Sequence, residues 1–156
     1  MTATAYSHIL RYITFRLADS LAGINILDVR EIVPETRITR VQQAPEVVMG
    51  LANLRGQTLT ILDLGIMLGL EPVIPGPHSH IIIFKHQDVG FMVDRIGDVI
   101  SIGSDQIEPV PANFNTPIRQ YTDHVIRKDE DLIMVLDANK LLGHTPGDGQ
   151  KLEDTI

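Results

Sequence analysis

The chain has 156 residues, no cysteine, and 13 lysines and arginines against 20 acidic residues, which gives a net charge of −7. This length suits one domain or two very small ones. The lack of cysteine excludes disulfide scaffolds, thiolate zinc sites and cysteine nucleophiles, and it is compatible with a reducing cytoplasm. An acidic chain with only seven aromatic residues is a poor candidate for nucleic acid. No apolar run reaches the roughly 18 residues of a membrane span, so we also expect no direct membrane insertion.

The aliphatic content indicates a compact, β-rich protein. Its 20 Ile, 16 Leu and 12 Val residues are typical of half-buried pleated surfaces and suffice for a core without many aromatic rings. The first half predicts a strand at 12–17 and a second at 23–33, with either a bulge or a short helical turn inside it. Further along, the pattern predicts a short strand at 37–41, a helical turn entered at Pro45 and closed at Gly50, and a hairpin over 51–62.

Asp63 precedes a short apolar segment that ends at Gly69, which predicts an N-capped helical turn with a C-terminal glycine. Residues 71–79 contain three prolines and interrupt any regular element, so we expect them to connect two halves of the chain. A buried strand at 81–84 and a turn at 88–90 follow.

Two segments of the first half recur in the second half. Residues 23–33 match residues 90–100 at an offset of 67 in their glycine, apolar and acidic positions, and residues 59–69 match residues 133–143 at an offset of 74. A period near 70 is too long for a solenoid repeat, so it predicts two related β subdomains, over about 12–70 and 80–143. Each is too small for a generous core of its own, and we expect the two to pack on each other. Residues 1–11 and 144–156 are expected to be flexible termini.

The repeat places one aspartate after an apolar strand in each half, and this raises an enzymatic alternative. Asp63 and Asp137 could form the carboxylate pair of an aspartic-type hydrolase. No hydroxyl residue follows either aspartate, and both fit equally as helix N-caps, so we favour the capping interpretation. His78 and His80 have metal-like spacing but no third ligand beside them, and no phosphate-binding glycine motif is present. We therefore expect no catalytic, cofactor-binding or metal-binding residues, and a small-ligand-binding β module finds no site either.

The tetrapeptide Asn53-Leu54-Arg55-Gly56 reads as an ordinary hairpin turn, in which the glycine permits a positive φ. A turn does not require arginine, however. Arginine offers a planar fork of donors that can hold a carboxylate. On these residues alone, we favour a solvent-exposed turn arginine that makes at most a weak surface ion pair.

Several short elements in this order resemble the CheW family of bacterial chemotaxis coupling proteins, over about residues 12–143. In the first half they are Gly23-Ile24-Asn25-Ile26, Val29-Arg30-Glu31-Ile32, Gly50, Asn53-Leu54-Arg55-Gly56 and Leu62-Asp63-Leu64; in the second half, Val93-Asp94, Asp98-Val99, Gln106-Ile107-Glu108-Pro109 and Leu136-Asp137. The resemblance implies a mainly β fold of two SH3-like five-stranded β-barrel subdomains that share a core, with a few short helices. It implies no catalysis.

The resemblance also implies a function and partners. CheW-like proteins are non-catalytic adaptors that couple the cytoplasmic tips of methyl-accepting chemoreceptors to the regulatory domain of a CheA-like histidine autokinase, in chemotaxis or a related chemosensory system such as one governing twitching motility. The implied location is the cytoplasm, in association with membrane-bound receptor arrays. Six residues belong by motif to the receptor-facing region: Val29, Glu31, Gly50, Asn53, Arg55 and Gly56. The resemblance places Arg55 near the groove that meets the receptor, so we expect it to pair with Glu31 of the same chain or to reach an acidic residue of a partner.

Overall fold

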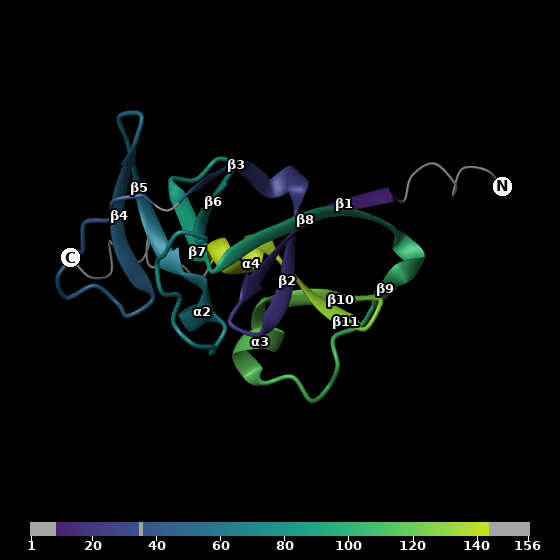
Figure 1. Cartoon of the computed structure of the whole chain (residues 1–156). Helices are drawn as coiled ribbons and strands as arrows, with labels where there is room; N and C mark the ends of the chain where they lie inside the picture. Colours follow the sequence, from purple (N-terminus) through teal and green to yellow (C-terminus); the bar gives the residue numbers. More distant parts are fainter. Residues whose placement is uncertain (1–8, 35, 144–156) are drawn as a thin grey trace.

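The computed structural model describes residues 9–34 and 36–143, which form two β-sheets with a few short helices (Figure 1). The first sheet has six strands in the order β8 (Arg95–Gly103), β1 (Ile9–Leu17), β2 (Ser20–Asn25), β11 (Asp131–Leu136), β10 (Thr122–Lys128) and β9 (Ile107–Glu108). The second has five strands in the order β3 (Val29–Pro34), β6 (His80–Phe84), β7 (Val89–Val93), β5 (Gln57–Asp63) and β4 (Val48–Leu54). The α-helices are α2 (Leu64–Met67), α3 (Thr116–Tyr121) and α4 (Ala138–Gly143).

The mainly β class with a few short helices is confirmed, and the two sheets are consistent with SH3-like subdomains. Two details of the expectation need correction. The first sheet has a sixth strand, the two-residue β9, and the strand pairing of each described sheet runs from one edge to the other without closing into a barrel. Figure 1 shows the β4–β5 hairpin at one end of the molecule and strands β9 to β11 toward the other.

Each half of the chain contributes strands to both sheets. The β1–β2 hairpin belongs to the first sheet, and β3 then crosses to pair with β6 of the second. The β6–β7 hairpin belongs to the second sheet, and β8 crosses back to pair with β1. In the same way β5 runs parallel to β7, and β11 runs parallel to β2. The repeated segments therefore occupy equivalent positions in the two sheets. The later strands of each half, however, belong to the sheet that the other half begins.

Because of this exchange, residues 71–79 do not connect one sheet to the other. They were expected to connect the two halves, yet they join α2 to β6, and the strands on both sides of them belong to the second sheet. The sheets divide the chain differently: the second takes residues 29–93, and the first takes the strands before and after that stretch.

The largest core lies between the sheets and draws on both of them. Its fully buried side chains include Phe15 and Ile24 from the first sheet and Ile82, Phe84 and Phe91 from the second. The rings of Phe84 and Phe91 meet edge to face, with centroids 5.0 Å apart. A smaller cluster fills the inside of the first sheet and consists of Tyr12, Ile100, Ile102, Ile126, Ile133 and Val135. The expectation that the two units share a core is therefore confirmed.

Three local expectations were wrong, each where pairing between distant segments decides the structure. The strand expected at 37–41 is a single bridge, in which Thr39 exchanges both backbone hydrogen bonds with Leu51. The helical turn expected before Gly50 is instead a turn closed by the Val48 N–H on the carbonyl of Pro45, at 2.9 Å, and Val48 already pairs with Leu62. The turn expected at 88–90 lies earlier, because Val89 and Gly90 belong to β7.

Candidate functional site

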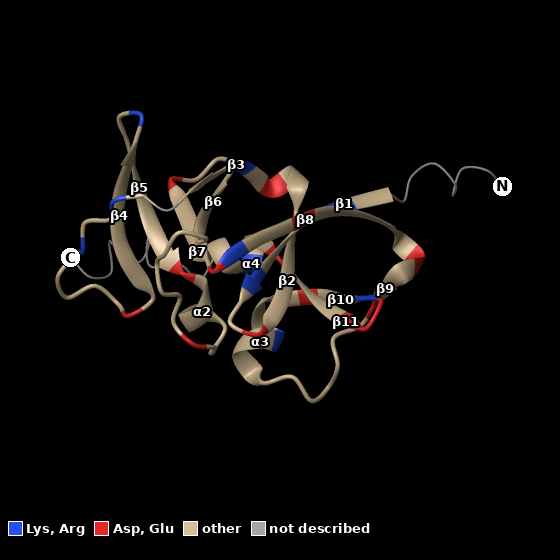
Figure 2. Ribbon diagram, viewed as in Figure 1, with Lys and Arg blue, Asp and Glu red and all other residues tan. Residues whose placement is uncertain are grey.

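The β4–β5 turn has the tight two-residue geometry expected from the sequence. Leu54 pairs with Gln57, and the two residues between them both have positive φ, +51° at Arg55 and +85° at Gly56. Such a turn follows the right-handed twist of a hairpin. The Asn53 side chain accepts a hydrogen bond from the Gly56 N–H at 3.1 Å and fixes the turn. Asn53, Arg55 and Gly56 are all exposed at this tip, where the ribbon of Figure 2 is coloured for a basic residue.

Arg55 donates a hydrogen bond from its guanidinium Nη2 to the carboxylate of Glu31. This contact joins the two edges of the second sheet. Glu31 belongs to the edge strand β3, and Arg55 lies in the turn that follows the other edge strand, β4. The Arg55 side chain is 67% exposed and that of Glu31 is 28% exposed, so the pair lies at the surface, where an ion pair adds little stability. The expected partnership of Arg55 and Glu31 within the chain is present, and it presents a guanidinium and a carboxylate together at the surface.

Gly50 and Val29, also predicted for this region, are buried rather than exposed. A Cβ atom on Gly50 would overlap the carbonyl oxygen of Thr39 and lie 2.7 Å from Cγ2 of Ile38, and the φ of +148° is itself unfavourable for other residues. Gly50 thus allows residues 38–39 to lie against β4. Val29 begins β3, pairs with Phe84 and belongs to the core between the sheets.

Asp88 was not singled out from the sequence, yet it connects several strands beside this tip. Its carboxylate Oδ1 accepts a hydrogen bond from Nε2 of Gln57 at 2.5 Å and lies 4.0 Å from Nη1 of Arg30. Its backbone carbonyl accepts from the Thr60 N–H at 2.9 Å. An aspartate in a polar turn carries no signal that separates this role from an ordinary turn residue.

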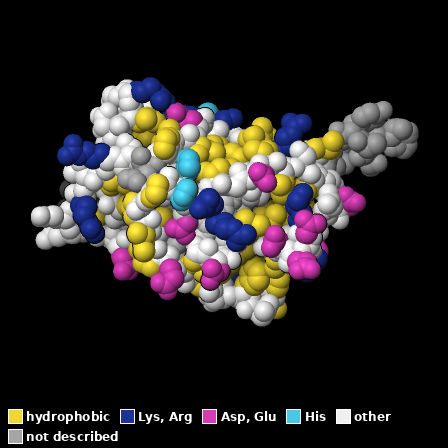
Figure 3. Space-filling model, in the orientation of Figure 1, with side chains coloured by type: hydrophobic (Ala, Val, Ile, Leu, Met, Phe, Trp, Pro, Cys, Tyr) yellow, Lys and Arg dark blue, Asp and Glu magenta, His cyan; other side chains and the backbone are white. Residues whose placement is uncertain are grey.

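Exposed apolar side chains lie near the same strands and were also missed. Leu27 is 71% exposed in a 3₁₀ turn just before β3, and the Asn25 side chain caps that turn by accepting from the Leu27 N–H at 2.9 Å. Val99 is 54% exposed on the edge strand β8, directly opposite Ile13 of β1. Figure 3 shows hydrophobic side chains gathered on this face near β3 and β8. Apolar side chains that gather into a contiguous exposed patch are typical of surfaces that a partner covers.

Asp63 and Asp137 are both helix caps, as expected. Asp63 is buried; its Oδ1 accepts from the Ile66 N–H at 3.0 Å, and its Oδ2 accepts from the Val73 N–H at 3.0 Å. Burial raises the pKa of the Asp63 carboxyl, although the hydrogen bonds from backbone N–H groups act in the opposite direction. Asp137 Oδ1 accepts from the N–H groups of Asn139 and Lys140, at 2.9 and 3.2 Å. The backbone thus uses both carboxylates, and the hydrolase alternative is not supported.

No group of three or more His, Cys, Asp or Glu residues with metal-binding geometry occurs in the described part of the chain. No helix among the described residues is long and apolar enough to cross a membrane.

The comparisons with known proteins agree with this architecture. The family model of the CheW-like domain matches residues 11–145. The chain belongs to the CheW-like family. It is 37% identical over 131 residues to chemotaxis protein CheW of Rhizobium meliloti, covering 83% of this chain and 84% of that protein. It is 31% identical over 135 residues to a probable chemotaxis protein CheW of Rhizobium etli, covering 85% and 87%.

A solved CheW structure has the same fold. The crystal structure of the scaffolding protein TtCheW from Thermoanaerobacter tengcongensis superposes with a TM-score of 0.75 at 31% identity and covers 85% of this chain and 88% of that one. The CheW-like resemblance of the sequence is therefore confirmed. Together, these relatives support a non-catalytic coupling or scaffolding role in chemotaxis.

Proposed function

We propose that this CheW-like protein couples the cytoplasmic tips of methyl-accepting chemoreceptors to the regulatory domain of a CheA-like histidine autokinase. The proposal extends the scaffolding role of the family to particular partners. It implies a cytoplasmic location beside membrane-bound receptor arrays. Coupling of this kind makes and breaks no covalent bond; the adaptor restricts how the two partners move relative to each other.

The observation that carries the proposal is the surface formed by the β4–β5 tip, β3 and the turn before it. It combines the Arg55–Glu31 pair with the exposed side chain of Leu27. A receptor tip is a helical hairpin, and an amphipathic helix binds an apolar surface that is flanked by polar anchors. In this proposal Glu31, Asn53, Arg55 and Gly56 present polar groups, Leu27 and Val99 supply apolar area, and the buried Val29 and Gly50 hold the backbone that positions them.

The proposal is tested by measuring binding of a soluble receptor tip fragment and, separately, of the kinase regulatory domain from the same organism. Arg55→Ala is expected to weaken binding of the receptor tip by roughly 1–3 kcal/mol, because a central arginine is a common interface anchor. Arg119→Ala, at an exposed arginine on α3, is the matched control. If Arg55→Ala binds both partners as the wild type does, the proposed surface is wrong.

A further inference from the structure

Arg16 of β1 and Arg95 of β8 lie directly opposite each other in the antiparallel pair of these strands. Cβ atoms of such opposed residues are about 4.5–5.5 Å apart, and like charges at this position destabilise a sheet. Both arginines are exposed. Within residues 9–34 and 36–143, neither takes part in an ion pair, although this chain has 20 acidic residues.

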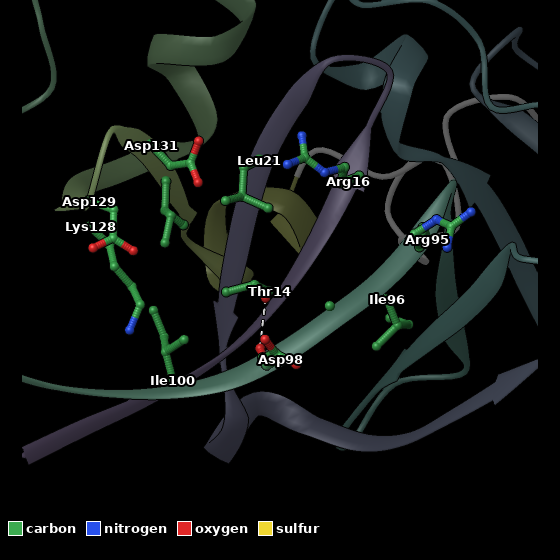
Figure 4. A pocket seen from close by; sticks show the side chains of 12 residues that line it. Thr14, Arg16, Leu21, Arg95, Ile96, Asp98, Ile100, Lys128, Asp129 and Asp131 are labelled. Carbon is green, nitrogen blue, oxygen red and sulfur yellow. Dashed lines mark hydrogen bonds between the residues drawn. The ribbon is translucent and has the colours of Figure 1, made fainter.

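Two hollows open on either side of this arginine pair, and both arginines line each of them. One hollow, of about 300 Å³, is completed by residues of the segment 74–79 and by Asp94. The other, of about 320 Å³, extends across β2 toward the β10–β11 turn. Figure 4 shows Arg16 and Arg95 at one side of this second hollow, and Lys128, Asp129 and Asp131 at the opposite side.

The acidic residues around the arginines limit what kind of anion would fit. Asp94 lies next to Arg95, but its Oδ2 already accepts a hydrogen bond from the Ala18 N–H at 2.6 Å. Asp98, Asp129 and Asp131 line the second hollow and would repel a ligand that carries several negative charges. A single carboxylate between the two guanidinium groups meets less repulsion than a polyphosphate would.

An apolar contact is available beside the arginines. Ile74 is 80% exposed and lines the first hollow together with Pro77 and His78. Figure 3 shows Lys and Arg side chains beside histidines in the middle of this face, with hydrophobic side chains near them. An amino-acid side chain that carries one carboxylate, next to an apolar neighbour, matches this combination better than a free inorganic anion does.

We propose that Arg16, Arg95 and the segment 74–79 form a docking site for an acidic segment of a partner protein. A glutamate or aspartate carboxylate accepts hydrogen bonds from both guanidinium groups, and an adjacent apolar side chain packs on Ile74. Guanidinium groups suit this role because they donate in a planar fork that matches a carboxylate. The bound carboxylate also removes the repulsion between the two arginines. The site uses none of the residues of the Arg55–Glu31 surface, so it does not depend on the function proposed above.

The test is an NMR titration of the ¹⁵N-labelled full-length protein with the capped peptide Gly-Leu-Glu-Leu-Gly, which carries a single carboxylate. Backbone resonances of Arg16, Arg95 and residues 74–79 are expected to shift in a saturable way at millimolar peptide. The peptide with glutamine in place of the glutamate should bind at least about tenfold more weakly. The double variant Arg16→Gln, Arg95→Gln should lose a similar factor, and Ile74→Ser a smaller one. Arg119→Gln, at an exposed arginine outside both hollows, is the control.

Several results would overturn the proposal. They are equal binding of the glutamine peptide, an equal loss in Arg119→Gln, and the absence of any saturable shift up to about 10 mM peptide. Inorganic phosphate that binds where the peptide does not would show a site for small oxyanions instead. The double variant should melt no lower than the wild type, because it removes a pair of like charges. A clear loss of thermal stability would mean that the arginines serve the fold rather than a partner.

Discussion

Arg55 holds a backbone conformation that is unfavourable for its own side chain. Its φ of +51° lies in the left-handed region, which costs a non-glycine residue roughly 1–2 kcal/mol. The exposed ion pair with Glu31 offsets only part of this cost. Arginine at this turn therefore costs stability, which agrees with the binding role proposed for it.

Replacing Arg55 by asparagine separates stability from binding. Asn-Gly is a favoured pair for a two-residue turn with positive φ at both positions, so Arg55→Asn should raise the free energy of unfolding by about 0.5–1 kcal/mol. The same change should weaken binding of the receptor tip, because the guanidinium is lost. Urea unfolding and a binding titration of one preparation measure both effects. A variant that is less stable than the wild type would show that the Glu31 pair matters more to the fold than its exposure indicates.

Gly50 supports the proposed surface from inside the protein. Gly50→Ala should lower the free energy of unfolding by at least about 2 kcal/mol, because the new Cβ overlaps the Thr39 carbonyl and the backbone has φ of +148°. Gly143→Ala is the matched control, since a Cβ there meets no atom within 4 Å. Chemical denaturation of the two variants gives the comparison. A small effect at Gly50 would mean that residues 38–39 move away from β4 without penalty.

Sequence reasoning anticipated the residues of this site unevenly, for a physical reason. The Arg55–Glu31 pair was expected only through the family resemblance, because the turn residues by themselves favour a solvent-exposed arginine. The exposure of Leu27 and Val99 was not foreseeable, because the sequence does not distinguish an exposed leucine or valine from a buried one. Whether a neighbouring strand covers it depends on pairing between distant segments, such as β1 with β8.

At the scale of elements, Asp63 connects helix α2 to the stretch before β6, two segments that the sequence analysis described separately. It caps α2 and also holds the N–H of Val73 in the stretch before β6. Asp63→Asn keeps an oxygen for one of these bonds but places an NH₂ group near the other N–H donors. We expect a loss of about 1–2 kcal/mol in the free energy of unfolding at pH 7.

The pH dependence of this loss follows from the direction of the pKa shift. Burial raises the pKa of Asp63 in the folded protein above the usual 3.8, so the folded state binds the proton more tightly than the unfolded state does. The contribution of Asp63 to stability therefore falls as pH rises from about 3.8 through the raised pKa, and it is constant above that. The wild type should exceed Asp63→Asn by more at the acidic end of this window than at pH 7. Unfolding curves at several pH values test this, and a gap that widens with pH would contradict it.

Elements with local signals were predictable from the sequence, and elements with distant partners were not. The 51–62 hairpin and the capped turn after Asp63 depend on residues close in the chain, and the structure contains both. By contrast, Val89 and Gly90 look compatible with a turn, but the parallel pairing of β7 with β5 places them in a strand. The internal repeat predicted two related units correctly, but similarity along the chain does not indicate that their later strands are exchanged.

For the whole molecule, this exchange predicts how the chain behaves when it is cut. Strands β1 and β2 of the first half need β8 and β11 from the second half, while β3 and β5 need β6 and β7. Neither half contains a complete sheet, and the core between the sheets draws on both halves. Fragments 1–75 and 76–156 should therefore each be largely unfolded when alone, because each leaves apolar strand faces and edges uncovered.

Mixing the two fragments should restore the native fold. The cut lies between the exposed Pro75 and the partly exposed Gly76, outside every strand, and the hydrogen bond from the Val73 N–H to Asp63 stays within the first fragment. The measurement is circular dichroism of each fragment alone and of the equimolar mixture. Only the mixture is expected to give a spectrum close to that of the wild type. If either fragment folds cooperatively alone, the halves are independent domains and the exchanged strands are not essential to them. A cut inside β7, between Phe91 and Met92, is the control: it divides a buried central strand and should prevent reassembly.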